Sequence, residues 1–316
     1  MKGIVIAEPK HRWNHIDIEI NEFIKKSNSE HIKFNNYDDY KKIPVNIEKH
    51  LSKNWYDFIS IWYYEDLLEK LAPLYELGLP VIMHTGDCWN RLFDGGKFKS
   101  IVNKHKPNIL IVENYCSINA FKKYLDDDDI KYVWLPHSFN PEIMKDYGKD
   151  KKFDVSFSGK FSNYTDRLKL HKYFMNRIYN GDNIKYKRLK STPTLSGYAK
   201  NLNKSWISFN SMQNESLLYY KDIFIGNCFS KNFEISACKA CLLNRKFGDA
   251  EDLGYKDGIN CILYDNIEDM EEKVNYYLDN KDILSKIIDK GYELAHNKHT
   301  VYNHVDNLIE QLDKVL

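Results

Sequence analysis

Short apolar runs alternate with longer, more polar segments over the first 135 residues of the chain. The runs are rich in β-branched residues and lie at 3–7, 56–62, 80–84, 108–112 and 132–135. Between two of them, leucines recur at helical spacing from Leu67 to Leu77, and Gly78 ends that segment in the manner of a helix C-cap. Buried strands that alternate with helices predict a parallel sheet covered on both faces.

A second series of the same kind follows a proline-containing connection at 136–141 and a charged stretch at 145–152. Its predicted strands lie at 153–158, 206–210, 241–244 and 261–264, and its predicted helices at 166–179, 198–203, 231–239, 267–279 and 283–296. The pattern therefore predicts an α/β protein with two doubly wound domains, at 1–148 and 149–300, and a helix at 301–316. Two such domains are expected to present the carboxyl ends of their strands to a shared cleft, where open α/β sheets bind ligands.

Composition narrows the class of protein. The 46 Lys and Arg residues nearly balance 45 Asp and Glu residues, which leaves a net charge of +1 and gives no support to a nucleic-acid partner. No stretch approaches the roughly 20 apolar residues that span a bilayer, so we expect a cytoplasmic protein without a membrane span. The six cysteines, Cys238-x-x-Cys241 included, have no zinc-site spacing and are expected to be reduced thiols that fill the core.

The most informative segment is 231–243, where Glu234 lies one turn into a short predicted helix that runs directly into an apolar strand. The start of a helix offers unpaired N–H groups and the positive end of the helix dipole, which suit a phosphate. Lys231 adds a positive charge there, and Glu234 can accept hydrogen bonds from the two hydroxyls of a ribose. Phosphate and ribose together indicate a nucleotide.

The same segment, Lys-Asn-Phe-Glu-Ile-Ser-Ala-Cys-Lys-Ala-Cys-Leu-Leu, resembles the motif Arg-x-Phe-Glu-Ile/Ala-x-Ala-x-Gly-x-x-Leu-Leu. That motif belongs to glycosyltransferases of the GT-B fold with a group-1 type C-terminal domain, in the spore-maturation-protein-like branch. The resemblance covers about residues 150–310, and 153–160 with Arg167 looks like the first strand and glycine loop of that domain. Three positions depart from the pattern: Lys231 replaces the usual Arg, Lys239 replaces the Gly, and Gly226 replaces a glutamate that many members carry eight positions before Glu234.

The resemblance implies two Rossmann-like domains facing a cleft, with the helix at 301–316 packing back toward the first. It also implies a glycosyltransferase of the hexosyltransferase type, which moves a sugar from a nucleotide-sugar donor to a glycan, lipid-linked or protein acceptor. Positive side chains would stabilise the leaving diphosphate, so neither a metal nor another cofactor is expected. The implied donor-binding residues are Glu234, Lys231, Ser230, Asn232, Gly159, Lys160 and Arg167.

Acceptor chemistry is expected on the first domain, where His84 and Asp87 follow a predicted strand. Either could act as the general base of an inverting enzyme, whereas a retaining enzyme needs none, and the sequence leaves this open. The acidic run at 126–129 is interpreted as a solvated turn and not as a metal site. Two alternatives remain: a GT-B-type sugar-nucleotide epimerase, and a non-catalytic protein that binds a nucleotide-sugar or a glycan.

Overall fold

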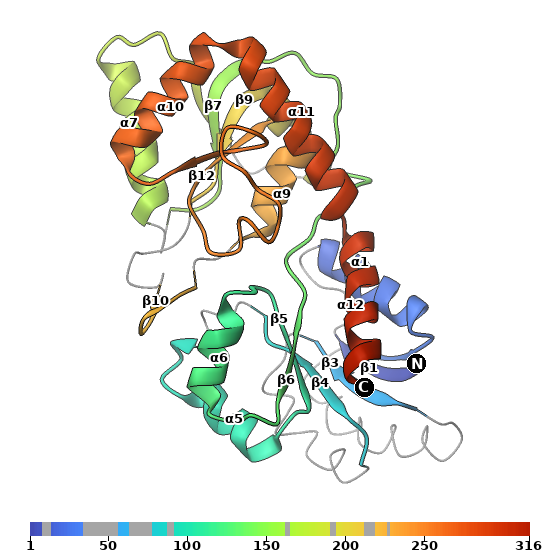
Figure 1. Cartoon of the computed structure of the whole chain (residues 1–316). Coiled ribbons are helices and arrows are strands. Elements are labelled where there is room, and N and C mark those ends of the chain that lie inside the picture. Colours follow the sequence, from blue (N-terminus) through green and yellow to red (C-terminus); the bar gives the residue numbers. More distant parts are fainter. Residues whose placement is uncertain are drawn as a thin grey trace. The chain divides into compact units, whose positions relative to one another are not determined.

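The computed structural model describes residues 1–7, 14–33, 56–62, 78–86, 92–161, 165–189, 194–211, 219–225 and 228–316. These residues divide into two compact units, which Figure 1 shows coloured along the sequence. The first unit contains residues 1–136 and 301–316, and the second contains residues 137–300. The boundary placed by sequence between 148 and 149 lies further along the chain than this division.

Hydrogen bonds explain why the connection after Pro136 belongs to the second unit. The backbone N–H of Tyr147 donates to Oδ1 of Asn203 at 2.7 Å, and Nδ2 of Asn203 donates to the backbone oxygen of Lys145 at 2.9 Å. Phe139 forms an isolated parallel bridge with Thr300 at the other end of the unit. The charged stretch is thus tied to the second unit and is not a free linker.

The first unit contains a six-stranded parallel sheet in the order β2-β1-β3-β4-β5-β6. Every described residue of β1, β3, β4 and β5 is buried, as expected for a sheet covered on both faces. The strands are β1 (Gly3–Ala7), β2 (Glu30–Lys33), β3 (Phe58–Ile61), β4 (Val81–His84), β5 (Ile109–Val112) and β6 (Lys131–Trp134). Five of them match the apolar runs of the sequence, and the edge strand β2 does not correspond to any predicted strand.

Helices cover both faces of this sheet. The helices α1 (Asn14–Lys26) and α12 (Val301–Val315) pack side by side on one face, and α5 (Lys97–His105) and α6 (Ser117–Leu125) lie on the other, as Figure 1 shows. Val305, Leu308 and Leu312 of α12 are fully buried in the core of this unit. The side chain of Gln311 also accepts from the backbone N–H of Trp134 and donates to its oxygen, so α12 is hydrogen bonded to the last residue of β6.

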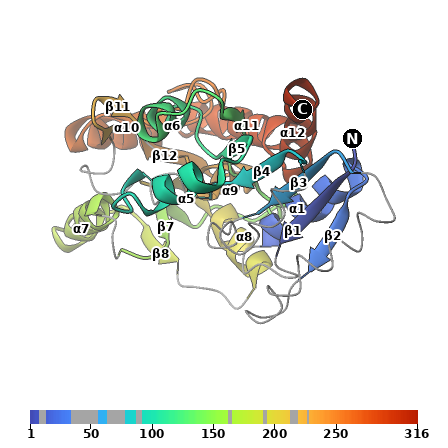
Figure 2. The same cartoon turned by 90° about the horizontal axis from the view of Figure 1, so that it is seen from below.

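The second unit contains a five-stranded parallel sheet in the order β13-β12-β9-β7-β8 and a short antiparallel pair. Its strands are β7 (Phe153–Ser158), β8 (Tyr186–Leu189), β9 (Ser205–Phe209), β12 (Cys241–Arg245) and β13 (Ile262–Tyr264), and the pair is β10 (Tyr219–Tyr220) with β11 (Ile223–Phe224). Figure 2 shows β7 next to β8, with α7 beside them. Since β8 adds to one side of β7 and the later strands add to the other, the strand order reverses between β7 and β9.

Three helices of the second unit share a core with one face of its sheet: α7 (Thr165–Tyr179), α10 (Ile267–Asp279) and α11 (Lys281–Lys298). The helices α8 (Leu195–Asn203) and α9 (Ser230–Ala237) contact the strands β9 and β12, respectively. Two parallel sheets with helices packed against them confirm the predicted fold class. No helix in the described part of the chain is long and apolar enough to cross a membrane.

Candidate functional site

Gly159 lies just past the carboxyl end of β7, where the strand order of the second sheet reverses. Its φ of +143° is one that residues with a β carbon rarely adopt. An added β carbon would lie 2.9 Å from Nζ of Lys231, 3.2 Å from the ring of Phe157 and 3.6 Å from Nη1 of Arg167. Glycine therefore lets two cationic groups come close to the backbone, and both border the small space beside its α carbon.

Lys231 reaches this space from the first turn of α9. Its Nζ donates to the backbone oxygen of Ser158 at 2.8 Å and makes no other hydrogen bond among the described residues. Burial, with a smaller effect from the charge of Arg167, lowers the pKa of Lys231 to about 8. The ammonium is thus mostly charged at neutral pH and still has N–H donors to offer. Ser230 begins the same helix and is half-buried.

Arg167 is buried in the first turns of α7, with 5% of its surface exposed. Its Nε donates to the backbone oxygen of Ser211 at 3.0 Å, and its Nη2 donates to Oδ1 of Asn210 at 3.1 Å. Asn210 in turn donates from Nδ2 to Oδ1 of Asn232 on α9 at 2.6 Å. The start of α7, the end of β9 and the start of α9 are therefore joined by one chain of hydrogen bonds, which fixes the position of the guanidinium.

Glu234 lies one turn after Lys231 on α9 and is half-buried. Its Oε2 accepts a hydrogen bond from the hydroxyl of Tyr198 on α8 at 3.2 Å, whereas Oε1 has no hydrogen-bond partner in the described part of the chain. Burial raises the pKa of Glu234, and the charges of Lys231 and His137 and the bond from Tyr198 oppose that rise. The carboxylate therefore keeps one oxygen available to accept from a ligand hydroxyl.

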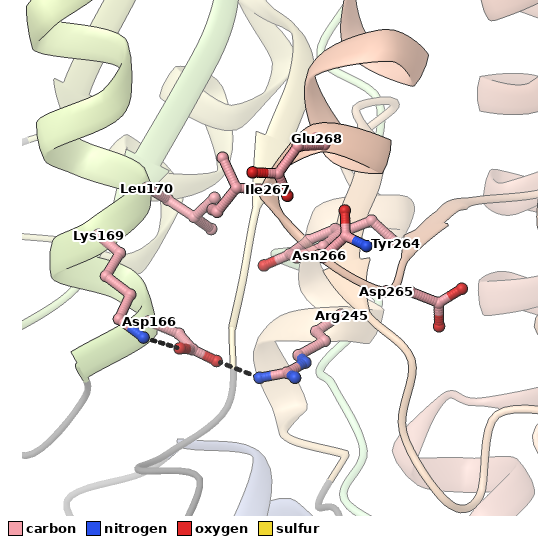
Figure 3. Close-up of a pocket in the computed structure, with 9 residues that line it drawn as sticks. All are labelled: Asp166, Lys169, Leu170, Arg245, Tyr264, Asp265, Asn266, Ile267 and Glu268. Atoms are coloured by element: carbon pink, nitrogen blue, oxygen red, sulfur yellow. Dashed lines mark hydrogen bonds and ion pairs between the residues drawn. The ribbon is translucent and has the colours of Figure 1, made fainter.

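A pocket of the second unit lies at the carboxyl ends of β12 and β13, between the first turns of α7 and α10. Figure 3 shows Asp166 between two basic side chains, and the ion-pair distances are 3.4 Å to Arg245 and 3.9 Å to Lys169. The charges of this pocket thus pair mainly with each other. Because Asp166 directly precedes Arg167, its pairing with β12 also holds the first turn of α7 in place.

The sequence pattern of a glycosyl transferase-like family matches residues 150–310, which is just over half of the chain. The chain belongs to this glycosyl transferase-like family. No curated protein matches the chain in sequence. The match does not distinguish the spore-maturation-protein-like branch, which stays a prediction.

Solved structures of glycosyltransferases resemble the whole chain in fold. HepE of Anabaena, in complex with UDP and glucose, matches with a TM-score of 0.65 and 11% identity, over 99% of this chain and 100% of that chain. Sucrose-phosphate synthase of Thermosynechococcus elongatus matches with a TM-score of 0.64 and 8% identity over 100% of both chains. A trehalose-6-phosphate synthase matches with a TM-score of 0.60 and 11% identity over 99% of both chains. These likenesses show that the glycosyl transferase-like chain has the GT-B fold.

The structure brings together some of the residues that sequence analysis singled out. Gly159, Lys231 and Arg167 border one space, and Glu234 and Asn232 lie on the same short helix as Lys231. Lys160 follows Gly159 directly but is exposed. The hydrogen bonds of Asn232 hold Asn210 and reach Sγ of Cys228 at 3.4 Å, so its side chain acts within the protein.

The two acceptor-side candidates belong to the first unit. His84 ends β4, is buried and stacks on Trp62 with ring centres 5.2 Å apart. Its Nδ1 accepts from the backbone N–H of Gly86 at 3.0 Å, which places the proton of the neutral ring on Nε2. Asp87 lies outside the described residues, and so does Gly226.

Lys239, where the family motif has glycine, adopts a φ of +56° just after α9. The N–H of Lys239 donates to the oxygen of Ser236 at 3.1 Å, and that of Ala240 donates to the oxygen of Ile235 at 3.2 Å. These two bonds form the Schellman motif that usually ends on glycine. The lysine side chain forms an ion pair with Asp289 at 2.7 Å. This position of the motif therefore serves the backbone conformation that ends α9, and it does not serve contact with a ligand.

The surroundings of the acidic run at 126–129 and of the Cys-x-x-Cys pair indicate that both have structural roles. Asp126 ends α6 with a φ of +56°, and the N–H of Asp129 donates to Oδ1 of Asp127 at 3.0 Å in an exposed turn. Cys238 and Cys241 are buried free thiols, and burial raises the pKa of each well above its usual value. Among the described residues, no group of three His, Cys, Asp or Glu side chains is arranged to hold a metal ion.

Sequence analysis missed three residues of the site: Tyr198, Asn210 and Ser211. Asn210 and Ser211 directly follow β9, and polar residues at the end of a strand beside a reversal of strand order are a usable signal. Tyr198 lies 36 residues before its partner Glu234, and no pattern in the sequence links the two.

Proposed function

We propose that this member of the glycosyl transferase-like family moves a hexosyl group from a nucleotide-sugar donor to a glycan, lipid-linked or protein acceptor. The observation that carries this proposal is the convergence of Lys231 and Arg167 on the space beside Gly159, with Glu234 one turn further along α9. A diphosphate requires positive charge and N–H donors, and a ribose requires an acceptor for its hydroxyls. The second unit offers these groups beside Gly159 and in the first turns of α9.

In the proposed complex, the donor diphosphate lies beside Gly159 and accepts hydrogen bonds from Nζ of Lys231 and from the first N–H groups of α9. The first N–H groups of a helix lack intrahelical partners, so those of Ser230 and Lys231 can add donors and a favourable dipole, whereas that of Asn232 already donates to the oxygen of Phe229 at 2.8 Å. Oε1 of Glu234 accepts from the ribose. The complex of HepE with UDP supports the choice of UDP as the first nucleotide to test.

The same groups would assist the reaction. Breaking the bond between sugar and diphosphate places additional negative charge on the leaving phosphate, and a fixed cation near that charge lowers the barrier. Lys231 and Arg167 supply it without a divalent metal. We therefore expect sugar transfer to continue at an unchanged rate in the presence of EDTA.

The first unit would supply the acceptor side, with Asp87 as the base if the reaction inverts the anomeric centre. His84 could serve as that base only once its Nδ1 gives up the hydrogen bond from Gly86, since its other ring nitrogen carries the proton. An inverting reaction needs a group that accepts the proton of the acceptor hydroxyl. Substitution of that base should lower kcat by about 100-fold or more while donor affinity stays unchanged. Variants His84→Gln and Asp87→Asn, compared by nucleotide release and by donor binding, test the two candidates.

A thermal-shift screen against UDP, GDP, ADP and CDP, and dTDP as a deoxyribose case, tests the proposed donor site. A nucleotide at a hundred times its Kd should stabilise the protein by about 2.7 kcal/mol. Glu234→Ala should remove most of that shift. If no nucleotide raises the melting temperature, the proposal is wrong.

Turnover then separates the candidate activities. A transferase releases free nucleoside diphosphate from the matched nucleotide-sugar in an acceptor-dependent manner. An epimerase changes the sugar of the nucleotide-sugar, and a passive binder leaves it intact.

A further inference from the structure

The carboxylate of Glu234 is held by a tyrosine from a different helix. Tyr198 lies one turn into α8, and its hydroxyl donates to Oε2 of Glu234 at 3.2 Å. Both side chains are half-buried, and Oε1 of the same carboxylate keeps no hydrogen-bond partner among the described residues. One oxygen is thus bound by the protein while the other is left for a ligand.

The helix that carries Tyr198 is fixed at both ends. Thr194 caps its start by accepting from the N–H of Gly197 at 3.1 Å. At its end, Asn203 is buried and hydrogen bonded to the backbone of Tyr147 and Lys145. The phenol is therefore presented to α9 by a rigid element, and the orientation of the Glu234 carboxylate follows from it.

Electrostatics favours the same arrangement. Burial and the charge of Glu234 raise the pKa of Tyr198 well above its usual value, so the phenol stays protonated and always donates. Burial raises the pKa of Glu234, while Lys231, Tyr198 and His137 favour its ionised form. A carboxylate that has lost the tyrosine donor would take up a proton more readily, and a protonated acid is a weaker acceptor.

We propose that Tyr198 is a positioning residue that holds Glu234 for the ribose of the donor and makes the site select ribonucleotides over 2′-deoxyribonucleotides. With Oε2 fixed by the phenol, the carboxylate plane is set and Oε1 can accept from a ribose hydroxyl in one geometry. A 2′-deoxy nucleotide lacks one of the two hydroxyls that such a carboxylate can bind. This inference rests on the proposed donor site and deepens it.

The test compares binding of UDP and 2′-deoxy-UDP by titration calorimetry, or the ADP, GDP or CDP pair if that base gives the larger thermal shift. Wild-type protein should favour the ribonucleotide by on the order of tenfold or more, because a hydrogen bond to a charged group is lost in the deoxy form. Tyr198→Phe keeps the ring and removes the hydroxyl. It should weaken UDP binding by about tenfold and 2′-deoxy-UDP binding by clearly less, so that the preference shrinks.

Two further measurements separate this role from a general effect on folding. Tyr186→Phe is the matched control, since it removes a phenol that hydrogen bonds to His171 at 2.8 Å in the same unit, and it should leave both affinities unchanged. As the pH falls, Tyr198→Phe should lose UDP at a higher pH than wild type. In a Glu234→Gln background, Tyr198→Phe should have no further effect on the preference.

The inference is overturned if Tyr198→Phe keeps the wild-type affinity and preference, or if it weakens both nucleotides equally. A wild-type protein that binds the deoxy form as tightly as the ribose form also overturns it. These results differ from failure of the donor site itself. If the donor site itself is wrong, the wild-type protein binds no nucleoside diphosphate. If only the role of Tyr198 is wrong, the wild-type protein still binds UDP and Lys231→Met still weakens that binding.

Discussion

Lys231 donates a hydrogen bond from Nζ to the backbone oxygen of Ser158, 2.8 Å away, and so joins the first turn of α9 to the end of β7. The two elements are separated by more than 70 residues of chain, yet their junction borders the space beside Gly159. A small change in either residue therefore alters both the position of a cation and the backbone that surrounds a bound anion.

The pH dependence of nucleotide binding should report the charge of Lys231. Its pKa is lowered to about 8, so the ammonium is charged below that pH and becomes neutral as the pH rises through it. The affinity for the nucleoside diphosphate should therefore fall between pH 8 and 9.5, by at most about tenfold per pH unit for one proton. Calorimetric titration from pH 7 to 9.5 measures this.

Two substitutions identify the group that titrates. Lys231→Arg keeps the charge at all these pH values, so its affinity should stay constant where that of wild type falls. Lys187→Met removes an exposed lysine of β8 and should behave as wild type. A wild-type affinity that is flat up to pH 9.5 contradicts the assignment.

Gly159→Ala should disturb binding through both conformation and contact. The φ of +143° costs a residue with a β carbon about 1–3 kcal/mol, and the methyl group would lie 2.9 Å from Nζ of Lys231. We expect the affinity for the nucleoside diphosphate to fall at least tenfold. Gly181→Ala is the matched control, since Gly181 also has a positive φ but nothing within 4 Å of its added carbon. Equal loss of affinity in both variants would refute a local role for Gly159.

Lys239 offers a test of backbone strain at the motif position that is usually glycine. The left-handed conformation costs a residue with a β carbon about 1–2 kcal/mol, whereas an exposed ion pair such as Lys239 with Asp289 contributes about 0.2–1 kcal/mol. Lys239→Gly should leave the free energy of unfolding unchanged or raise it by up to about 1 kcal/mol. Lys239→Ala keeps the strain and loses the pair, so it should be the least stable of the three in urea denaturation. The reverse order of the Gly and Ala variants contradicts this explanation.

His299 should make the second unit sensitive to acid. It is 4% exposed and donates from Nε2 to the backbone oxygen of Leu253 at 2.8 Å, and burial lowers its pKa to about 4. An unfolded histidine titrates near pH 6.5, so between these values the unfolded chain binds a proton that the folded chain does not. The free energy of unfolding should therefore fall by up to about 3 kcal/mol as the pH drops from 6.5 to 4.

A non-titrating replacement isolates the contribution of this histidine. His299→Gln keeps an N–H donor for Leu253, so its stability should decline less steeply over the same pH range. The measurement is urea denaturation at half-unit steps of pH for both proteins. Identical slopes would show that another group dominates the acid response.

The sequence predicted those elements best whose own residues determine their burial. The apolar run at 153–158 and the helix at 267–279 coincide with β7 and α10, because each carries a continuous buried face. The strands β2 and β8 were missed, since Glu30–Lys33 and Tyr186–Leu189 lie at sheet edges and are rich in charged residues. Edge strands need not be apolar on both faces, so periodicity alone does not identify them.

The candidate site was only partly predictable for a related reason. Glu234, Lys231 and Gly159 carry local signals, namely a helix start and a glycine after a strand. The role of Arg167 depends on Asn210 and Ser211, which approach it only through the order of strands in the sheet. The contact of Tyr198 with Glu234 depends on how α8 and α9 are brought together in the folded unit, and a single sequence does not specify that.

The return of α12 to the first sheet has a consequence for synthesis on the ribosome. Val305, Leu308 and Leu312 complete the apolar interior built by β1, β3 and α1, yet they are translated after the whole of the second unit. Residues 1–136 must therefore leave an apolar surface exposed to solvent while residues 137–300 are synthesised and can already fold. Nascent chains stalled before residue 301 should bind chaperones through residues 1–136, and release should follow once residues 301–316 have emerged.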